Sequence, residues 1–298
     1  MAIGDTEADP AYPEFWLNEA HQYLRANTVM PRLVRTDLDD ELAEEGDAVN
    51  ITELGGLTVR DKQEDTSITT DSPSNSTVQV TLDQHKYIAW TLEDTADAKA
   101  VDEALDYLSK SIALLAEEID KELLGLYSSV ATQVGSAGTD VREGTVIDAR
   151  QKLNDLKAPM GDRALVVSSK DEASLLEVDK FTEASSIGNE GEAIREAQLG
   201  RLYGFDTYMS QLVQETGSSP VQTHNIAFDP DAFVLASRPL PQPTEGATSV
   251  AQEDSETGIV MRYTRQYSID KLATTHVIDV LYGTKAVRAD ELAVEVLA

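Results

Sequence analysis

The side chains best suited to acid–base or metal chemistry are four histidines and one pair of adjacent glutamates. The histidines are scattered along the chain, at His21, His85, His224 and His276. Because this scatter lacks metal-ligand spacing, it favours surface positions or hydrogen-bonded structural positions over a metal site. Glu117 and Glu118 could act as a carboxylate pair, but an acidic helix presents a solvated face by default. We therefore predict no catalytic residue, no metal ligand and no cofactor.

Other motifs also give no specific site. Residues 37–47 are strongly acidic but lack the alternating ligands and the turn glycine of a calcium loop, so we interpret them as a charged connector. The glycines match neither a phosphate-binding loop nor a dinucleotide-binding turn. No Gly-x-Ser-x-Gly elbow is present. The function must therefore depend on the residues that determine the fold of the chain.

The composition excludes several classes of protein. The chain has 298 residues, of which 41% are hydrophobic, which suits one large domain or two modest ones with a sizeable core. It has no cysteine, so disulfides and thiolate metal sites are excluded. Residues 1–10 are acidic and polar, and no run of about 18 apolar residues occurs. We expect neither a membrane span nor a cleaved secretory signal.

The net charge is extreme. Asp and Glu total 54 against 24 Lys and Arg, which gives a formal charge of −30. Such a surface repels nucleic acid, because phosphate binding depends on Lys and Arg. Self-repulsion also opposes compact or assembled states at low salt, and halophilic proteins use this property. We interpret the charge as adaptation to high salt; the alternative is an ordinary acidic cytosolic protein.

Residues 47–90 have the pattern of an extended arm. Short apolar runs flank a polar tip at residues 66–76, which is the composition of a long hairpin. A lone two-stranded arm is only marginally stable in water, so it needs another surface. The sequence shows no obvious cover elsewhere, and we expect the surface to belong to a second copy of the chain. The apolar positions of the arm are Val49, Ile51, Leu54, Leu57, Val59, Val78, Val80 and Leu82.

Residues 94–130 predict one long helix with Gly125 as its single glycine. The apolar positions recur at alternating intervals of three and four, which forms one helical stripe. At 1.5 Å per residue, about 35 residues would span roughly 50 Å, so we interpret this helix as a spine. The stripe consists of Val101, Leu105, Leu108, Ile112, Leu115, Ile119, Leu123 and Leu126.

An α/β region follows the helix. Thr145 and Asp148 predict a capping box that opens a helix through Leu156. Residues 164–167 predict a short buried strand, and Ser168 or Ser169 predicts the cap of the next helix. Residues 199–209 predict strand and turn structure around two glycines, and residues 259–297 are rich in predicted strands.

Five stretches occur in the order found in one viral protein family. Residues 80–90 (VTLDQHKYIAW) resemble the strand that leads from the extended loop into the spine, and residues 163–168 (RALVVS) resemble a central-domain strand. Residues 200–210 (GRLYGFDTYMS) are similar to a glycine-phenylalanine turn, and residues 227–233 (AFDPDAF) and 281–288 (LYGTKAVR) to later elements. Together they resemble the major capsid proteins of tailed double-stranded DNA viruses, which have the Hong Kong 97-like fold.

This resemblance implies an α+β fold with an N-terminal arm, an extended β-hairpin loop, a long spine helix and a central α/β domain. The implied divisions are an N-terminal arm at 1–46, the extended loop at 47–92, and a peripheral domain with the spine at 93–144. The central, axial domain would follow at 145–246. C-terminal strands at 247–298 would return to the peripheral domain.

The resemblance also implies the partners. Copies of the chain would form hexamers and pentamers of an icosahedral shell around packaged double-stranded DNA, assembled in the host cytoplasm and kept in the virion. A separate scaffold, a portal and decoration proteins would be further partners, and contact with DNA would be weak and non-specific. The expected intersubunit contacts in the loop and arm are Phe15, Trp16, Ile51, Leu54, Leu57, Val59, Val78 and Val80.

Two alternatives stay open at this point. An encapsulin-like nanocompartment would share the fold but enclose a cargo enzyme. A halophilic soluble enzyme or binding protein with an unrecognised site belongs to a different class, and its oligomers would be small and discrete.

Overall fold

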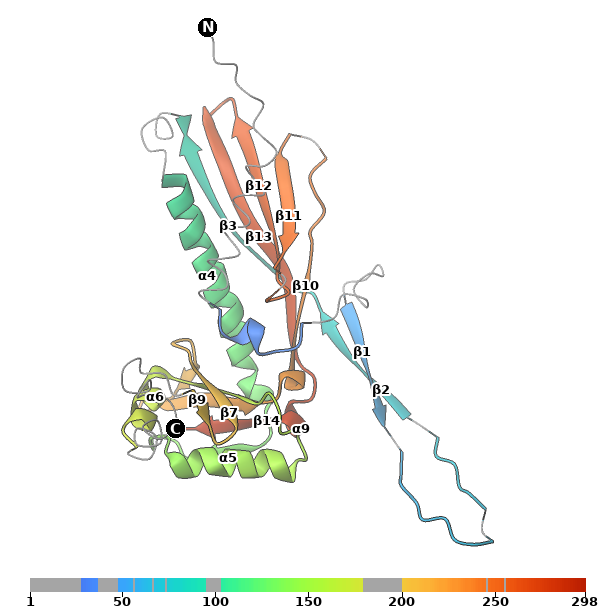
Figure 1. The fold of residues 1–298 in the computed structure, drawn as a ribbon. Helices are drawn as coiled ribbons and strands as arrows, with labels where there is room; N and C mark the ends of the chain where they lie inside the picture. Colours follow the sequence, from blue (N-terminus) through green and yellow to red (C-terminus); the bar gives the residue numbers. More distant parts are fainter. Residues whose placement is uncertain are drawn as a thin grey trace.

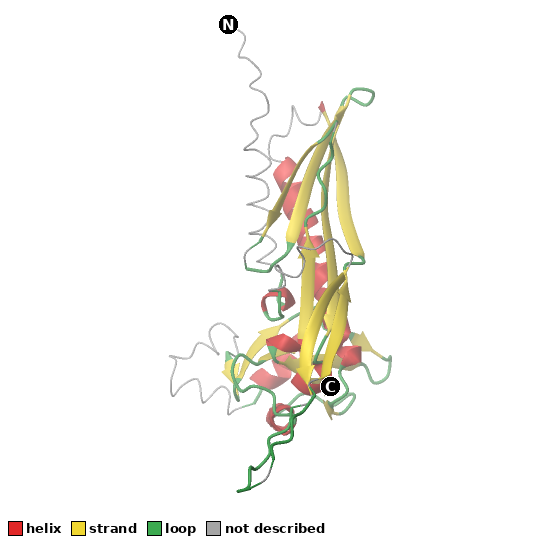
Figure 2. Ribbon diagram, turned by 90° about the vertical axis from the view of Figure 1, so that its right-hand side faces the viewer, coloured by secondary structure: helices red, strands yellow, loops and turns green. Residues whose placement is uncertain are grey.

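Two β-sheets and one long helix form an elongated body, from which a two-stranded arm projects (Figure 1). The computed structural model describes residues 28–36, 48–55, 57–65, 67–72, 74–94, 103–178, 200–244, 246–254 and 256–298. In Figure 2 the long strands rise above a more compact part that contains the shorter helices. The fold is therefore α+β, as the sequence predicts.

The spine is helix α4 (Glu103–Gly125), and it buries the expected apolar stripe from Leu108 to Leu123. Its 23 residues span about 35 Å, which is shorter than expected from residues 94–130. The α-helix ends at Gly125, and a 3-10 turn, η2 (Leu126–Ser129), leads into extended backbone at Val130. The single glycine of the run thus marks the end of the α-helix, consistent with its low helix propensity. Residues 95–102 lie outside the described part of the chain.

The upper sheet has five antiparallel strands, and β13 (Ala273–Ala286) is its longest. β12 (Val260–Ser268) and β3 (Gln84–Glu93) both pair with the first part of β13. β10 (Phe233–Arg238) pairs with its end, and β11 (Thr248–Glu253) pairs with β12. β3 is thus paired over its whole length with a strand about 190 residues away in sequence, and α4 runs alongside both strands (Figure 1).

The lower sheet has seven strands. The path is β4 (Gln133–Gly135), β14 (Ala293–Leu297), β9 (Gln222–Phe228), β5 (Ala164–Val167), β7 (Phe205–Met209) and β6 (Arg201–Leu202), with β8 (Glu215–Thr216) paired to β9. β5 occupies the residues predicted for the buried strand, and all four are buried. β14 lies in this sheet, although we predict from the sequence that the whole of 247–298 returns to the peripheral domain.

Helices α5 (Glu143–Asp155) and α6 (Ser169–Leu176) belong to the lower part. Ser168 caps α6 as predicted, because its side chain accepts a hydrogen bond from the Asp171 N–H at 3.1 Å. The capping box predicted at Thr145 is wrong, since α5 begins at Glu143 and its N-cap is Arg142. Glu143 suits the first turn electrostatically and accepts a hydrogen bond from Tyr203 at 2.6 Å, a tertiary contact that the local sequence does not reveal.

The turn between β6 and β7 is the predicted glycine-phenylalanine turn. Tyr203 and Gly204 both have positive φ, at 47° and 91°. Two left-handed residues in succession are typical of the tight hairpin turn whose twist matches its strands. The remaining short elements are η1 (Met30–Arg32), η3 (Pro230–Ala232) and α9 (Ala289–Leu292).

Candidate assembly surface

The projecting arm is built on a regular hairpin. β1 (Ala48–Gly55) and β2 (Ser74–Thr81) pair antiparallel from Ala48 opposite Thr81 to Gly55 opposite Ser74. Their sequences, AVNITELG and SNSTVQVT, contain Glu53 as the single charged residue. A strand pair with neither Lys nor Pro lacks the usual protection of its outer edges against pairing with another chain.

Beyond the hairpin, residues 57–65 and 67–72 continue the arm as irregular loop (Figure 1). Asp71 joins its two sides: its carboxylate accepts a hydrogen bond from the Thr58 N–H at 2.8 Å and from Arg60 at 2.5 Å. Thr58 and Asp71 each lie three residues beyond the last pair of the hairpin, so the two sides keep the hairpin register. Arg60 first, and then the Thr58 N–H, hold the pKa of Asp71 below its usual value.

The loop exposes three large apolar side chains. Leu57 is 78% exposed, Ile68 is 81% exposed and Val59 is fully exposed. Leaving a Val, Leu or Ile side chain in water forgoes about 1.5–3 kcal/mol of burial free energy each. Three such residues on a projecting loop therefore point to a surface that becomes covered by another molecule.

The base of the arm is covered by its own chain. Ile51 and Val80 are 7% and 0% exposed, and they form a small apolar cluster with Val234 and Ala236 of β10. These two predicted contact residues thus anchor the arm to the body of their own chain. Val78 is half-buried.

The remaining predicted contact residues are less informative. Leu54 lies on β1 opposite Asn75. Phe15 and Trp16 lie outside the described residues. The assignment of the whole set to intersubunit contacts therefore stays a prediction.

The root of the arm crosses β13 at Gly283. A Cβ atom at Gly283 would lie 2.0 Å from the carbonyl oxygen of Thr81 and 2.9 Å from its carbonyl carbon. Only a residue without a side chain allows the end of β2 to pass this close to β13. The direction of the arm is thus set by a backbone-to-backbone contact in addition to the apolar cluster.

Comparison with solved structures identifies this architecture. No family model matches the sequence, and neither does any curated protein. A structure from Mycobacterium phage Che8 superposes with a TM-score of 0.65 at 21% identity, covering 90% of both chains. The capsid of Ralstonia phage GP4 gives a TM-score of 0.64 at 10% identity, covering 91% of this chain and 88% of that chain. The chain has the Hong Kong 97-like capsid fold.

A third solved structure has a similar fold. A virus-like particle from Pyrococcus furiosus superposes with a TM-score of 0.53 at 11% identity, covering 96% of this chain and 99% of that chain. At these identities the likeness establishes the capsid fold alone.

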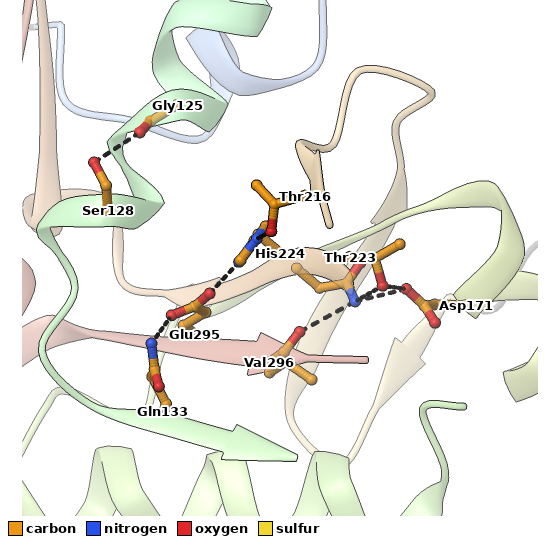
Figure 3. A network of polar contacts seen from close by, with 10 residues as sticks. Gly125, Ser128, Gln133, Asp171, Thr216, Thr223, His224, Glu295 and Val296 are labelled. Carbon is orange, nitrogen blue, oxygen red and sulfur yellow. Dashed lines mark hydrogen bonds and ion pairs between the residues drawn. The ribbon is translucent and has the colours of Figure 1, made fainter. Parts of the chain in front are cut away.

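Within the capsid fold, the described histidines have structural positions, as the sequence predicts. His224 is buried in the lower sheet, where Nε2 lies 2.6 Å from the Thr216 hydroxyl and Nδ1 contacts the Glu295 carboxylate (Figure 3). Its ring also stacks on Tyr127, with centroids 4.1 Å apart. Both ring nitrogens of His224 are thus engaged within the fold. Gln133 donates to the other oxygen of Glu295 at 2.5 Å.

The other histidines lie in the upper sheet or outside the described residues. His276 is buried, bonded to the Tyr263 hydroxyl at 2.6 Å and stacked on Trp90. His85 lies 3.0 Å from Asp279. His21 is outside the described residues.

A second buried network surrounds Asp171 at the start of α6 (Figure 3). One carboxylate oxygen accepts hydrogen bonds from Ser168 at 2.7 Å, Thr223 at 2.6 Å and Asn225 at 2.7 Å. Asn225 also donates to the carbonyl of Val296 at 3.2 Å, which joins β9 to β14. The network links α6 to the lower sheet and supplies three donors to Oδ2 of Asp171, whereas its Oδ1 is buried without a hydrogen-bond partner among the described residues.

The paired glutamates lie on the spine. Glu117 is exposed, whereas Glu118 lies 3.2 Å from the Lys86 ammonium, which also contacts Glu122 at 3.0 Å. These ion pairs raise the pKa of Lys86, chiefly through Glu122, and tie β3 to α4. The local sequence pattern does not indicate this partner, because Lys86 is about 30 residues away.

The described part of the chain contains no group of three or more His, Asp or Glu side chains placed to hold a metal ion. None of its helices is long and apolar enough to cross a membrane. In the loop of the arm, Ile68 is exposed but is absent from the predicted contact residues, because it is the only large apolar residue in the polar tip TSITTDSPSNS.

Proposed function

We propose that this chain is the major capsid protein of a tailed double-stranded DNA virus. Copies assemble into hexamers and pentamers of an icosahedral shell and remain in the virion. The observation that carries the proposal is the projecting arm, whose base is anchored within the chain and whose loop exposes Leu57, Val59 and Ile68. The Ralstonia phage GP4 match supports a structural rather than an enzymatic role.

In this proposal each region has a separate task. Residues 145–246 form the axial domain except for β10, which pairs with β13 in the upper sheet; the spine and this upper sheet form the peripheral domain. β14 belongs with the axial sheet because it pairs with β9 and β4. Residues 1–46 act as an arm that grips neighbours, and Phe15 and Trp16 are its proposed contacts.

Each copy of the arm contributes binding free energy, and the symmetry of the shell repeats this contribution at every equivalent contact. Burying Leu57, Val59 and Ile68 against a neighbour contributes about 1.5–3 kcal/mol for each side chain before the cost of ordering the loop. A heterologous contact of this kind, repeated by rotation, closes into a ring. Leu54 and Val78 are proposed to contribute beside the anchored base.

The net charge of −30 shapes the other partnerships. An acidic inner wall repels DNA, so contact is weak, non-specific and mediated by cations. A separate scaffold, a portal and decoration proteins complete the particle in this proposal. The same charge supports a halophilic host, in which salt screens the repulsion between subunits.

A nanocompartment shell is the second candidate, because the Pyrococcus furiosus particle matches nearly the whole of both chains. The contents of purified particles separate the two functions. Particles from the natural source that hold double-stranded DNA support the virus capsid. Particles that hold one co-purifying protein and no DNA support the nanocompartment.

Substitutions in the loop test the role of the arm. Leu57→Asp and Val59→Asp should block shell formation while the melting temperature of the free chain stays unchanged, since both side chains are exposed. Leu114→Asp on α4, at a side chain that is 50% exposed, is the matched control and should still assemble. Electron microscopy provides the readout, and normal shells from both loop variants would refute the proposed role.

A further inference from the structure

A buried carboxylate on the spine holds the first described segment of the chain. Asp120 of α4 is 1% exposed. Its Oδ2 accepts a hydrogen bond from the Val29 N–H at 2.8 Å, and its Oδ1 accepts one from the Met30 N–H at 3.2 Å. Val29 is the N-cap of η1, and its own side chain makes no capping bond. The Asp120 carboxylate therefore caps η1 from an element about 90 residues away in the sequence.

We call residues 28–36 the strap, because they run from α4 across β10 to the turn between β11 and β12 (Figure 1). The Arg35 N–H donates to the first carbonyl of β10 at 3.1 Å, and the Leu235 N–H donates to the Arg35 carbonyl at 3.1 Å. At the far end, a Cβ atom on Gly258 would lie 2.8 Å from the Cβ atom of Thr36. The strap thus joins the spine to the upper sheet.

The strap is attached by few backbone contacts. Its 3-10 helix has three residues, and Arg35 forms an isolated bridge with Val234. Met30, Pro31 and Val34 are buried and supply the apolar contact. Short segments of this kind open locally at a lower free energy than the whole fold. The strap can therefore detach while both sheets stay folded.

Few charges offset the ionised form of Asp120. From η1, Arg32 acts on the carboxylate with opposite charge, but its side chain is 37% exposed and pairs with Glu256 at 3.3 Å. On α4, the neighbouring Glu117 and Lys121 are exposed. Of the charged residues on the surrounding elements, Asp231 and Lys285 are exposed, and those engaged elsewhere are Glu118 and Glu122 with Lys86, Asp279 with Arg262, and Asp254 with Thr257.

We propose that the strap is fastened to the spine while Asp120 is protonated and is released when Asp120 ionises. This goes beyond the proposed function, because it concerns a single chain before any assembly. Protonation at Oδ1 gives up the longer of the two hydrogen bonds and keeps the cap on the Val29 N–H at Oδ2. Release of nine residues would lengthen the tether of residues 1–27 by up to about 30 Å. The device thus controls how far these residues reach.

The direction of the switch follows from linkage. Burial raises the pKa of Asp120 to about 7, and the Val29 and Met30 N–H groups and Arg32 only partly oppose the rise. Detachment returns the carboxyl to water, where the pKa of Asp is about 3.9. The attached state therefore binds the proton more tightly, and attachment strengthens as the pH falls below 7. The gain is up to about tenfold for each pH unit between the two pKa values.

Hydrogen exchange of the full chain in 0.1 M KCl, from pH 5.5 to 8.5, measures the release. The reporters are the N–H groups of Arg35 and Leu235, which join the strap to β10 and bond to carbonyls in place of Asp120. Their protection factors, corrected for the intrinsic exchange rate at each pH, should fall by up to about tenfold per unit up to pH 7. Above pH 7 they should level off. The N–H groups of β5 should keep constant protection and so report that the fold stays intact.

Two variants make the same chemical change at different carboxyl groups. Asp120→Asn removes the titrating group, so the protection of the Arg35 N–H should no longer depend on pH. Glu256→Gln is the matched control, because it changes the exposed carboxyl that pairs with Arg32 and should keep the pH dependence of the native chain. The native chain alone gives the slope, so the test stands even if Asp120→Asn folds poorly.

Three results would overturn the inference. The first is a protection factor at Arg35 that does not change with pH in the native chain. The second is an equal fall at β5, which would show global unfolding in place of strap release. The third is a native slope in Asp120→Asn, which would assign the titration to another group. Because these measurements use single chains, a failure to form particles would count against the proposed function alone.

Discussion

The substitution Gly283→Ala probes the root of the arm with the smallest possible change. Its Cβ atom would lie 2.0 Å from the carbonyl oxygen of Thr81, whereas real Cβ contacts essentially never fall below 3.0 Å. The obstacle is backbone, so β2 and β13 must separate by about 1 Å. Overpacking of this kind typically costs about 1–3 kcal/mol. We expect the free energy of unfolding of the unassembled chain to fall by that amount, measured by urea denaturation.

Gly125→Ala is the matched control for this measurement. A methyl group at this position would meet no atom within 4 Å, and the φ of −64° at Gly125 suits any residue. Replacing a helical glycine with alanine stabilises a helix by up to about 1 kcal/mol, so the two variants should change stability in opposite directions. A Gly283→Ala chain within about 0.3 kcal/mol of the native one would refute the tight crossing.

A double-mutant cycle shows whether the crossing and the apolar cluster form one root. Ile51→Ala alone should cost about 2–5 kcal/mol, since the side chain is 7% exposed beside Val234. In the Gly283→Ala background its cost should be smaller, because the shifted β2 has already loosened the cluster. Strictly additive costs would show that the two contacts act independently.

Three further predictions concern charge. Burial raises the pKa of Asp120 on α4 to about 7, against the N–H groups of Val29 and Met30, so its folded pKa exceeds its unfolded one. We compare the free energy of unfolding of the native chain with that of Asp120→Asn. The native chain should lose up to about 1.4 kcal/mol per pH unit, relative to the variant, between about pH 4 and 7, and the difference should stay constant above pH 7. A difference in urea midpoints that does not change with pH would contradict this. Asp71→Asn removes the ionised acceptor that joins the sides of the loop, so trypsin should cut after Arg60 faster while the melting temperature stays unchanged, and equal cutting rates would count against the loop geometry. Raising KCl from 0.1 to 1 M shortens the Debye length from about 10 Å to about 3 Å, so the melting temperature should rise; full stability at low salt would argue against a halophilic host.

Local patterns in the sequence predicted local structure well. Residues 164–167 form the buried strand, Ser168 caps α6, and the apolar stripe of residues 108–123 is buried on α4. Each of these depends on side chains within one or two turns of each other. The end of the spine at Gly125 was accessible from the same kind of reasoning, since glycine is a poor helix former.

Contacts between segments that are distant in the sequence could not be predicted from local patterns. The base of the arm is buried because Val80 meets Val234, more than 150 residues away, and β3 pairs with β13 over a similar separation. The sequence therefore predicted a wholly uncovered arm where the structure shows an anchored base and an exposed loop. The start of α5 differs for the same reason, since the partner of Glu143 is Tyr203.

Size-exclusion chromatography followed by negative-stain electron microscopy, in molar KCl, tests the central claim most directly. We expect closed icosahedral shells that elute at the void volume, and dissociation of these shells as the salt is removed. Discrete small oligomers at every salt concentration would contradict the assignment of this chain to a self-assembling shell.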